Sequence, residues 1–284
     1  MGQKIDTRAI GLDTGLALIK WLTGAENLHY GLWDGLELSA GNLRRAQDAY
    51  SDKLFALFPP GLLRVLDIGG GAGETAKKLI ALGHQVDIVV PSSYLAARCR
   101  VNAPEARVHE CRFEDFTGQG PFDLCLFSES FQYIPLEQGL PRCLPLLAPG
   151  GSVLIADCFR AEAYQGRQVS GPQPGGGHRL TTFRATLSGL PLTVTHEEDI
   201  TDSVAPSIDL EQGFFNVLGL GLSRTQDEVK VKKPRAWWFA TKALALFLSE
   251  RRRRNLTRRL TDTSRTAEVF RQYNRYCILR LKKP

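Results

Sequence analysis

Apolar residues recur at helical spacing in two segments near the start of the chain. Residues 8–27 place Leu12, Leu16 and Ile19 on one face, which predicts a first helix. Residues 42–58 predict a second helix, which the following Pro-Pro-Gly ends.

Short apolar runs then alternate with helical segments as far as residue 157. Each run has the length of a strand and is bounded by glycine, proline or a helical pattern. The predicted strands are 64–68, 85–90, 107–111, 122–127 and 152–157, with helices at 74–82, 93–102 and 136–147 and a Pro-Gly-Gly turn at 149–151. This alternation is typical of an α/β fold with a parallel sheet and helical crossovers.

The last part of the chain is less regular. Gly, Pro and Gln dominate residues 166–177, which predicts a loop. The remaining predicted elements are a helix at 181–188, a sixth strand at 192–199, a mostly helical region at 210–270 and a final strand at 276–281.

Composition limits the class of protein. A chain of 284 residues with 43% hydrophobic residues fits one large α/β domain with an insertion. Its six cysteines form no CxxC pair, so we expect reduced core residues and no metal site. The start shows no signal-peptide pattern, and the apolar stretch 236–248 is interrupted by Lys242 and too short to span a bilayer. These features favour a cytoplasmic protein.

Positive charge is concentrated near the end of the chain. Residues 225–284 carry 17 Lys and Arg against 5 Asp and Glu, although the net charge of the whole chain is only +6. Basic clusters in 230–259 flank an apolar stretch with a Trp pair, which fits peripheral contact with an anionic membrane surface or a cap over an apolar pocket. A packed surface helix with solvated ends fits the same pattern. Nucleic acid is the less favoured partner, because no binding module accompanies the charge.

The segment from Asp67 to Gly73 follows a predicted strand and precedes a helix. Asp67, Gly69, Gly71 and Gly73 fit D-x-G-x-G-x-G, in which glycines let a ligand lie directly on the backbone. The dinucleotide pattern G-x-G-x-x-G fails because Glu74 occupies its last glycine, and an acid before the loop repels pyrophosphate. The acid suits a ligand with ammonium and sulfonium groups. A tight strand–helix turn without a ligand is the alternative.

These residues, with the Pro-Gly-Gly before the fifth strand, resemble the class I S-adenosylmethionine-dependent methyltransferases. The segment 29–33 resembles the N-terminal cap of a subgroup that contains sterol C-methyltransferases, cyclopropane and mycolic acid synthases, and natural-product small-molecule methyltransferases. In that subgroup this segment folds over the methionine part of S-adenosyl-L-methionine, which implies cofactor contacts for Tyr30 and Trp33. Plain packing of the first helix on the sheet is the alternative for both.

The resemblance implies a doubly wound, seven-stranded, mostly parallel sheet. We expect an N-terminal helical cap at 1–60, a cofactor-binding α/β core at 61–202 and a helical substrate lid at 203–272. The final strand, within 273–284, is expected to be antiparallel and to lie inside the sheet, since Cys277, Ile278 and Leu279 are apolar in a basic tail.

Two positions depart from the family pattern. The acid that usually binds both ribose hydroxyls at the end of the second strand is replaced by Val90, and the acid near adenine is replaced by Arg112. A valine side chain accepts no hydrogen bond, so Ser92 or water must serve the ribose. Phe113 remains available to pack on adenine.

Candidate catalytic residues follow the fourth and fifth strands. Ser128 and Glu129 are expected near the methionine end of the cofactor, with Glu129 as a base or as a helix N-terminal acid. Tyr133 is either catalytic or a core residue. His178 follows three glycines and is either a base that enters the acceptor site or a solvated loop residue.

Two functions remain open from the sequence. One is S-adenosylmethionine-dependent methyl transfer to a small molecule or lipid, on an oxygen, nitrogen or carbon atom, with an acceptor that can be anionic. The other is a non-catalytic binding protein on a methyltransferase scaffold, docked through its basic helix. The intact glycine loop favours the enzyme.

Overall fold

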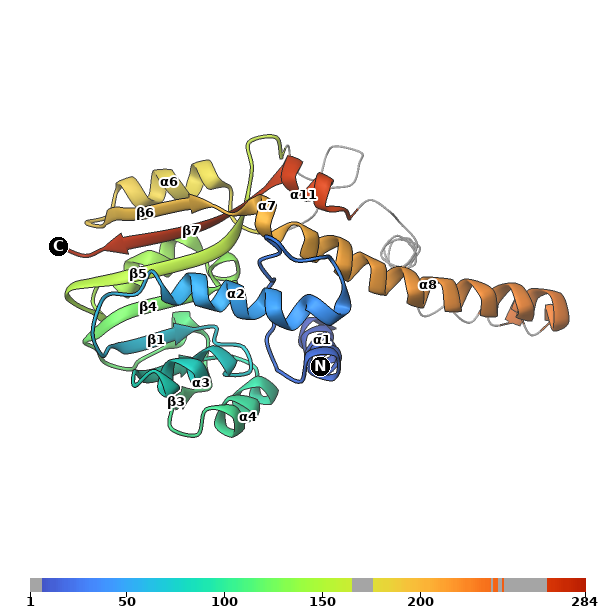
Figure 1. Cartoon of the computed structure of the whole chain (residues 1–284), viewed down its shortest axis with the longest axis horizontal. Coiled ribbons are helices and arrows are strands. Elements are labelled where there is room, and N and C mark those ends of the chain that lie inside the picture. Colours follow the sequence, from blue (N-terminus) through green and yellow to red (C-terminus); the bar gives the residue numbers. More distant parts are fainter. Residues whose placement is uncertain (1–6, 165–175, 236, 240–241, 243–264) are drawn as a thin grey trace.

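The computed structural model of the chain describes residues 7–164, 176–235, 237–239, 242 and 265–284. In these residues one seven-stranded sheet carries helices on both faces (Figure 1). The strands are β1 (Arg64–Ile68), β2 (Gln85–Val89), β3 (Arg107–His109), β4 (Phe122–Ser128), β5 (Leu147–Arg160), β6 (Thr193–Asp199) and β7 (Asn274–Lys282). Their order, β3-β2-β1-β4-β5-β7-β6, confirms the doubly wound sheet predicted from the sequence.

The final strand enters the sheet between β5 and β6. It runs antiparallel to both neighbours, whereas β1 to β5 pair in parallel. Leu279 pairs with Ile155 in this ladder, and both side chains are buried. Burial on both faces explains the apolar run in the tail, so the predicted position of the last strand is confirmed.

Alternate side chains of the central strands pack in two separate hydrophobic cores, one on each face of the sheet. In β4, Leu124 and Leu126 pack on the face covered by the first helices, while Cys125 and Phe127 pack on the opposite face. This alternation follows from the two-residue period of a strand. All six cysteines are free, and five of them are buried.

The four helices between the strands are α3 (Glu74–Ala81), α4 (Ser93–Asn102), α5 (Leu136–Cys143) and α6 (Leu180–Ser188). Two of them are shorter than the patterns predicted, by one residue in α3 and by four in α5, while α4 has the predicted bounds and α6 begins one residue earlier. The helix expected at 136–147 ends at Cys143, because Pro145 has no N–H with which to continue the helical hydrogen bonds. Strand β5 already begins at Leu147, so the expected turn at 149–151 lies within its bounds, with Gly150 at φ +73°.

The N-terminal segment consists of α1 (Thr7–Thr23), the short 3-10 turn η1 (Ala40–Asn42) and α2 (Leu43–Phe55). It lies over one face of the sheet, through α2, and beside the carboxyl ends of the parallel strands (Figure 1). The first helix ends before residue 27, since Gly24 takes a left-handed φ of +73°. Beyond it, the backbone N–H groups of Glu26 and Tyr30 donate to the side chains of Glu74, which begins α3, and Glu129, which follows β4, and these bonds tie the segment to the α/β core.

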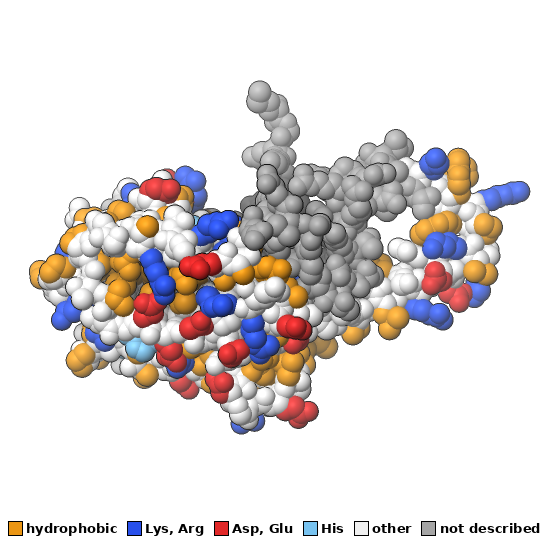
Figure 2. All heavy atoms as spheres, turned by 90° about the horizontal axis from the view of Figure 1, so that it is seen from above, with side chains coloured by type: hydrophobic (Ala, Val, Ile, Leu, Met, Phe, Trp, Pro, Cys, Tyr) orange, Lys and Arg blue, Asp and Glu red, His pale blue; other side chains and the backbone are white. Residues whose placement is uncertain are grey.

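A long helix separates β6 from β7. The elements here are α7 (Thr201–Val204), α8 (Pro206–Lys232) and α11 (Ala267–Tyr273). The first turns of α8 pack on the body, and the rest projects away from the sheet (Figure 1). Exposed apolar side chains mix with charged ones along this projection (Figure 2). Within the described ranges, every helix is too short or too polar to span a bilayer.

Candidate active site

The loop between β1 and α3 forms the centre of the candidate site. Gly69, Gly71 and Gly73 take φ values of +78°, +55° and +88°, in the left-handed region that favours glycine. At Gly69 a side chain has no room either, because its Cβ would lie 2.3 Å from the Cβ of Ser130. The local shape of the loop therefore requires the glycines that the sequence pattern picked out.

A cavity of about 650 Å³ opens beside this loop, a size that suits a cofactor with a small molecule. Nine of the residues predicted from the sequence line it, namely Asp67, Gly69, Gly71, Ser92, Arg112, Phe113, Ser128, Glu129 and Tyr133. We call the part near Val90 and Phe113 the β2 end and the part near Ser128 and Glu129 the β4 end.

Asp67 lies between the two ends and carries an unsatisfied carboxylate. The residue is 1% exposed, and its Oδ2 has no hydrogen-bond partner. Burial raises the pKa of this carboxyl to about 7. Gly70, which is not part of the sequence pattern, lies against the Asp67 carboxylate. A Cβ at Gly70 would lie 2.6 Å from Asp67 Oδ2. A buried, unpaired carboxylate gains most from a cationic ligand, so the site fits an ammonium group.

At the β2 end the lining is apolar apart from a few polar groups. Val90 and Phe113 are buried, 2% and 3% exposed, and line the cavity. Ser92 is engaged as the N-cap of α4, since its Oγ accepts from the N–H of Leu95 at 3.3 Å. Its hydroxyl hydrogen is available to a ligand, although its role toward a ribose stays a prediction.

Two charged residues follow β3 at the same end. The Nε of Arg112 donates to Asp115 at 2.7 Å, so its charge is already paired. Glu114 also lines the cavity, and the sequence reasoning missed it because the acid expected there was matched to Arg112. A carboxylate therefore does occur close to the position where the family pattern places one.

Glu129 dominates the β4 end. It has a φ of +56°, unusual for a non-glycine residue, and its own N–H donates to the Ala156 carbonyl at 2.9 Å. Its Oε1 accepts from the Tyr30 N–H at 2.7 Å and from the Tyr276 hydroxyl at 2.9 Å. Burial raises the pKa of Glu129 to about 8, the Tyr30 N–H opposes this, and the nearby Asp157 adds to it. The backbone and side chain of Glu129 are thus both fixed by tertiary contacts.

A chain of hydroxyl groups runs beneath the β4 end. The Tyr276 hydroxyl lies 2.9 Å from that of Tyr50, which lies 3.1 Å from Ser128 Oγ. Both tyrosines are at most 1% exposed. An ionised Glu129 accepts only, so every hydroxyl in the chain then points toward it, and Ser128 offers lone pairs to the cavity. Sequence reasoning missed both tyrosines, because they lie 226 positions apart.

His29 and Asn27 line the cavity and were not singled out from the sequence. The His29 Nδ1 lies 2.8 Å from the Tyr30 carbonyl oxygen. A carbonyl only accepts, so Nδ1 carries the hydrogen and Nε2 keeps its lone pair. Burial lowers the pKa of His29 to about 4, and its ring stacks on Tyr50 at 4.5 Å. His29 is therefore a neutral part of the wall.

The two aromatic residues expected over the cofactor lie elsewhere. The cofactor contact expected for Trp33 is corrected by the structure, because Trp33 does not line the cavity. It packs in a small core with Leu43, and its Nε1 donates to Ser207 at 2.8 Å. The Tyr30 ring packs edge-on against Phe270, with centroids 6.4 Å apart. Tyr30 reaches the site through its backbone N–H. The direction of each ring depends on α2, α8 and α11, which a local motif does not contain.

Of the other two candidate bases, one lines the cavity and one does not. Tyr133 lines it and is 55% exposed. The prediction of His178 as a base in the acceptor site is also corrected, because His178 does not line the cavity. Its Nε2 lies 2.9 Å from the Ile134 carbonyl oxygen and 3.2 Å from the Phe131 carbonyl oxygen. Because both carbonyl oxygens only accept, Nε2 carries the hydrogen and donates to the segment that follows β4.

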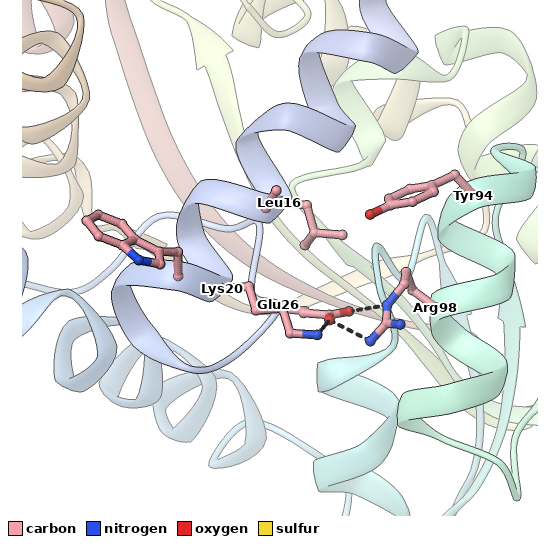
Figure 3. A pocket seen from close by; sticks show the side chains of 7 residues that line it. Leu16, Lys20, Glu26, Tyr94 and Arg98 are labelled. Atoms are coloured by element: carbon pink, nitrogen blue, oxygen red, sulfur yellow. Dashed lines mark hydrogen bonds and ion pairs between the residues drawn. The ribbon is translucent and has the colours of Figure 1, made fainter. Parts of the chain in front are cut away.

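A second, smaller pocket of about 270 Å³ lies between α1 and α4. Glu26 forms part of the wall of both pockets. Its carboxylate accepts from Lys20 and Arg98 at 2.6 Å each (Figure 3), and from Asn102 at 2.7 Å. Burial opposes ionisation, but these hydrogen bonds outweigh it and lower the pKa of Glu26 to about 2. The cluster fastens α1 to the α/β core.

The described beginning of the basic segment lies far from the cavity. Lys230 is on the exposed end of α8, 23 residues after Ser207, a separation of roughly 35 Å along a helix axis. Lys230 and Lys232 thus do not cover the site. Most of 230–259, including Arg251 to Arg254, lies outside the described residues.

Part of the chain is similar in sequence to known proteins. Residues 65–151 match the model described as a methyltransferase domain, which begins in β1 and ends in β5. The tRNA 5-carboxymethoxyuridine methyltransferase of Escherichia coli (strain K12) is 33% identical over 123 residues, covering 39% of this chain and 46% of that protein. A ubiquinone biosynthesis O-methyltransferase of Rhodopseudomonas palustris (strain BisB5) is 27% identical over 155 residues, covering 49% and 61%. The chain spans about half the length of these curated relatives.

Solved structures resemble the whole chain. A cyclopropane synthase from Mycobacterium tuberculosis has a TM-score of 0.65 at 18% identity, covering 99% of this chain and all of that one. A geranyl diphosphate C-methyltransferase from Streptomyces coelicolor A3(2) has a TM-score of 0.64 at 13% identity, with the same coverage. At these identities the similarity shows the fold alone. Together, the comparisons show a match to a methyltransferase domain over residues 65–151 and a shared fold over the whole chain.

Proposed function

We propose that this protein is an S-adenosyl-L-methionine-dependent methyltransferase that acts on a small-molecule or lipid-like acceptor. The unpaired, buried carboxylate of Asp67 beside the glycine loop carries the proposal, because it fits the ammonium group of the donor. The similar S. coelicolor enzyme was solved with S-adenosyl-L-homocysteine, the product of such a donor.

Each part of the cavity has a distinct role in this proposal. The glycine loop lets the donor lie on the backbone, and Asp67 holds its ammonium group. Phe113 packs on the adenine at the β2 end, where Glu114 and Ser92 offer polar contacts. The donor supplies an electrophilic methyl carbon when bound. At the β4 end, Ser128 and Glu129 orient the acceptor in line with that carbon.

The donor half is tested by calorimetry with S-adenosyl-L-homocysteine. We expect Asp67→Asn to weaken binding by about tenfold or more, because it removes a charge-assisted partner. Asp202→Asn, which changes a 90% exposed carboxylate, is the matched control and should bind normally. Wild-type protein that fails to bind at about 1 mM, the weak end of ordinary enzyme constants, would contradict the proposal.

The acceptor half is tested by transfer of label from methyl-labelled donor into extract fractions. A tRNA fraction should be among the fractions tested, because one relative is named for a tRNA base. We propose label in the small-molecule or lipid fraction instead. The lid role of 203–272, and contact of 230–259 with an anionic acceptor group or membrane surface, remain part of this proposal. No described feature favours the non-catalytic alternative.

A further inference from the structure

The charge of the cavity lining is strongly one-sided. Among the described residues that line it, Arg112 is the sole Lys or Arg, and Asp115 already pairs with it. It also lies at the β2 end, away from Glu129. The β4 end therefore has acids and hydroxyl groups but offers no cation to an anionic ligand.

Glu129 presents one occupied and one available oxygen at this end. Oε1 holds two donors, from Tyr30 and Tyr276, while no hydrogen bond to Oε2 occurs among the described residues. Since Glu129 lines the cavity and is partly exposed, Oε2 is the oxygen left for a ligand. The φ of +56° and the two donors fix the carboxylate without using this oxygen.

Charged and polar groups from four elements, β5, α8, β7 and α2, surround Glu129. Asp157 on β5 and Glu211 on α8 add negative charge, and Arg265 before α11 pairs with Glu211 at 3.2 Å. Tyr276 on β7 and Tyr50 on α2 contribute neutral hydroxyl groups. Arg265 is thus committed to Glu211, and the described lining offers no cation at this end, so an anion beside Oε2 would meet repulsion without a compensating partner.

We infer that the β4 end selects an acceptor whose reacting atom is a hydroxyl oxygen or an amine nitrogen, and that Glu129 Oε2 binds the hydrogen on that atom. This inference rests on the proposed function. It excludes a carboxylate or phosphate as the reacting group. An anionic group elsewhere on the acceptor stays compatible with it, provided that the group lies outside the β4 end.

The proton and electron balance follows from this placement. The acceptor lone pair forms a bond to the methyl carbon while the carbon–sulfur bond breaks, and its electron pair stays on sulfur. The sulfonium becomes a neutral thioether, and the acceptor gains positive charge. Its proton then passes to Glu129 Oε2, so one carboxylate and one sulfonium become one carboxylic acid and one thioether. An ionised Glu129 stabilises the positive charge as it develops.

Sinefungin and S-adenosyl-L-homocysteine provide a test that needs no acceptor. Sinefungin carries an ammonium group where the donor carries its transferable methyl, so it mimics positive charge at the β4 end. We expect Glu129→Gln to lower the affinity for sinefungin relative to S-adenosyl-L-homocysteine by about tenfold or more at pH 8.5. Gln keeps an oxygen for Tyr30 and Tyr276, so the loop should keep its shape.

Glu114→Gln is the matched control, because it removes a carboxylate from the same cavity at the β2 end. It should leave the affinity ratio within about threefold, since charge effects fall off with distance in a polar site. In the wild type, the preference for sinefungin should grow from pH 6.5 to 8.5 and stay flat in Glu129→Gln.

The possible outcomes separate the two proposals. If wild-type protein binds neither compound, the proposed function fails. If S-adenosyl-L-homocysteine binds but Glu129→Gln leaves the ratio unchanged, the function stands and the inference is overturned. An equal loss in Glu114→Gln would also overturn it, because the selection would then come from the general field of the cavity.

Discussion

Replacing Asp67 with Asn should stabilise the ligand-free protein while weakening donor binding. The carboxyl of Asp67 is buried, and its Oδ2 has no partner, so ionisation costs free energy in the folded state. Its pKa rises from 3.8 to about 7 through burial alone. An active-site group that is costly until its ligand arrives is a common source of conflict between stability and function.

The size of the effect follows from the two pKa values. Each pKa unit corresponds to about 1.4 kcal/mol, and the cost appears once the pH exceeds the unfolded-state pKa. At pH 5 the folded protein keeps the proton, and the cost relative to the unfolded chain is about 1.5 kcal/mol. Above pH 7 both states are ionised, and the cost levels off at about 4 kcal/mol. Stability contributed by this group therefore falls as pH rises from about 4 to 7.

Urea unfolding of the ligand-free wild type and Asp67→Asn at pH 5 and pH 8 measures this effect. The free energy of unfolding of the variant, relative to wild type, should rise by about 2.5 kcal/mol between the two pH values. Because the cost of burying the Asn amide hardly depends on pH, it cancels when the variant-minus-wild-type free energies at the two pH values are subtracted. Asp202→Asn should show no such change. If the difference in free energy of unfolding between Asp67→Asn and wild type is the same at pH 5 and pH 8, the carboxylate of Asp67 is not desolvated in the folded protein.

Three further predictions concern other parts of the site. Val90→Asp should keep donor binding and tighten it by up to about tenfold in calorimetry, because it supplies an acceptor for the ribose hydroxyls. Tyr276→Phe removes a donor that lowers the pKa of Glu129, so the acid limb of the pH–activity profile should move to higher pH. Glu26→Gln should lower the free energy of unfolding by about 2 kcal/mol at pH 7. That loss should disappear as pH falls from about 4.5 to 2, where wild-type Glu26 takes up its proton.

Each of these predictions has a control or a contradicting result. Loss of binding by folded Val90→Asp would mean that an apolar contact is needed there. Tyr50→Phe should shift the profile less than Tyr276→Phe, since Tyr50 reaches Glu129 only through Tyr276. Glu198→Gln, which breaks a partly exposed pair with Lys53, should cost less than about 1 kcal/mol. If it costs as much as Glu26→Gln, the Glu26 cluster is an ordinary surface ion pair.

The parts of the site that depend on consecutive residues could be predicted from the sequence. The loop after Asp67 takes its shape because its three glycines lack side chains and can adopt positive φ values between the flanking strand and helix. The alternation of strands and helices, and the apolar run in β7, follow from burial on both faces of a sheet. These features need only local periodicity and elementary backbone sterics, so one sequence was enough to predict them.

Only the tertiary structure decided what surrounds the β4 end of the cavity. Tyr276 contacts Glu129, and Tyr50 contacts Tyr276, because α2 and β7 come together there from positions more than half of the chain apart. Trp33 and His178 turn away from the cavity because Ser207 and the carbonyls after β4 satisfy their ring nitrogens. Hydrogen-bond partners and desolvation depend on residues distant in sequence, so the sequence supplied candidate bases, and the folded environment distinguished Glu129 from the others.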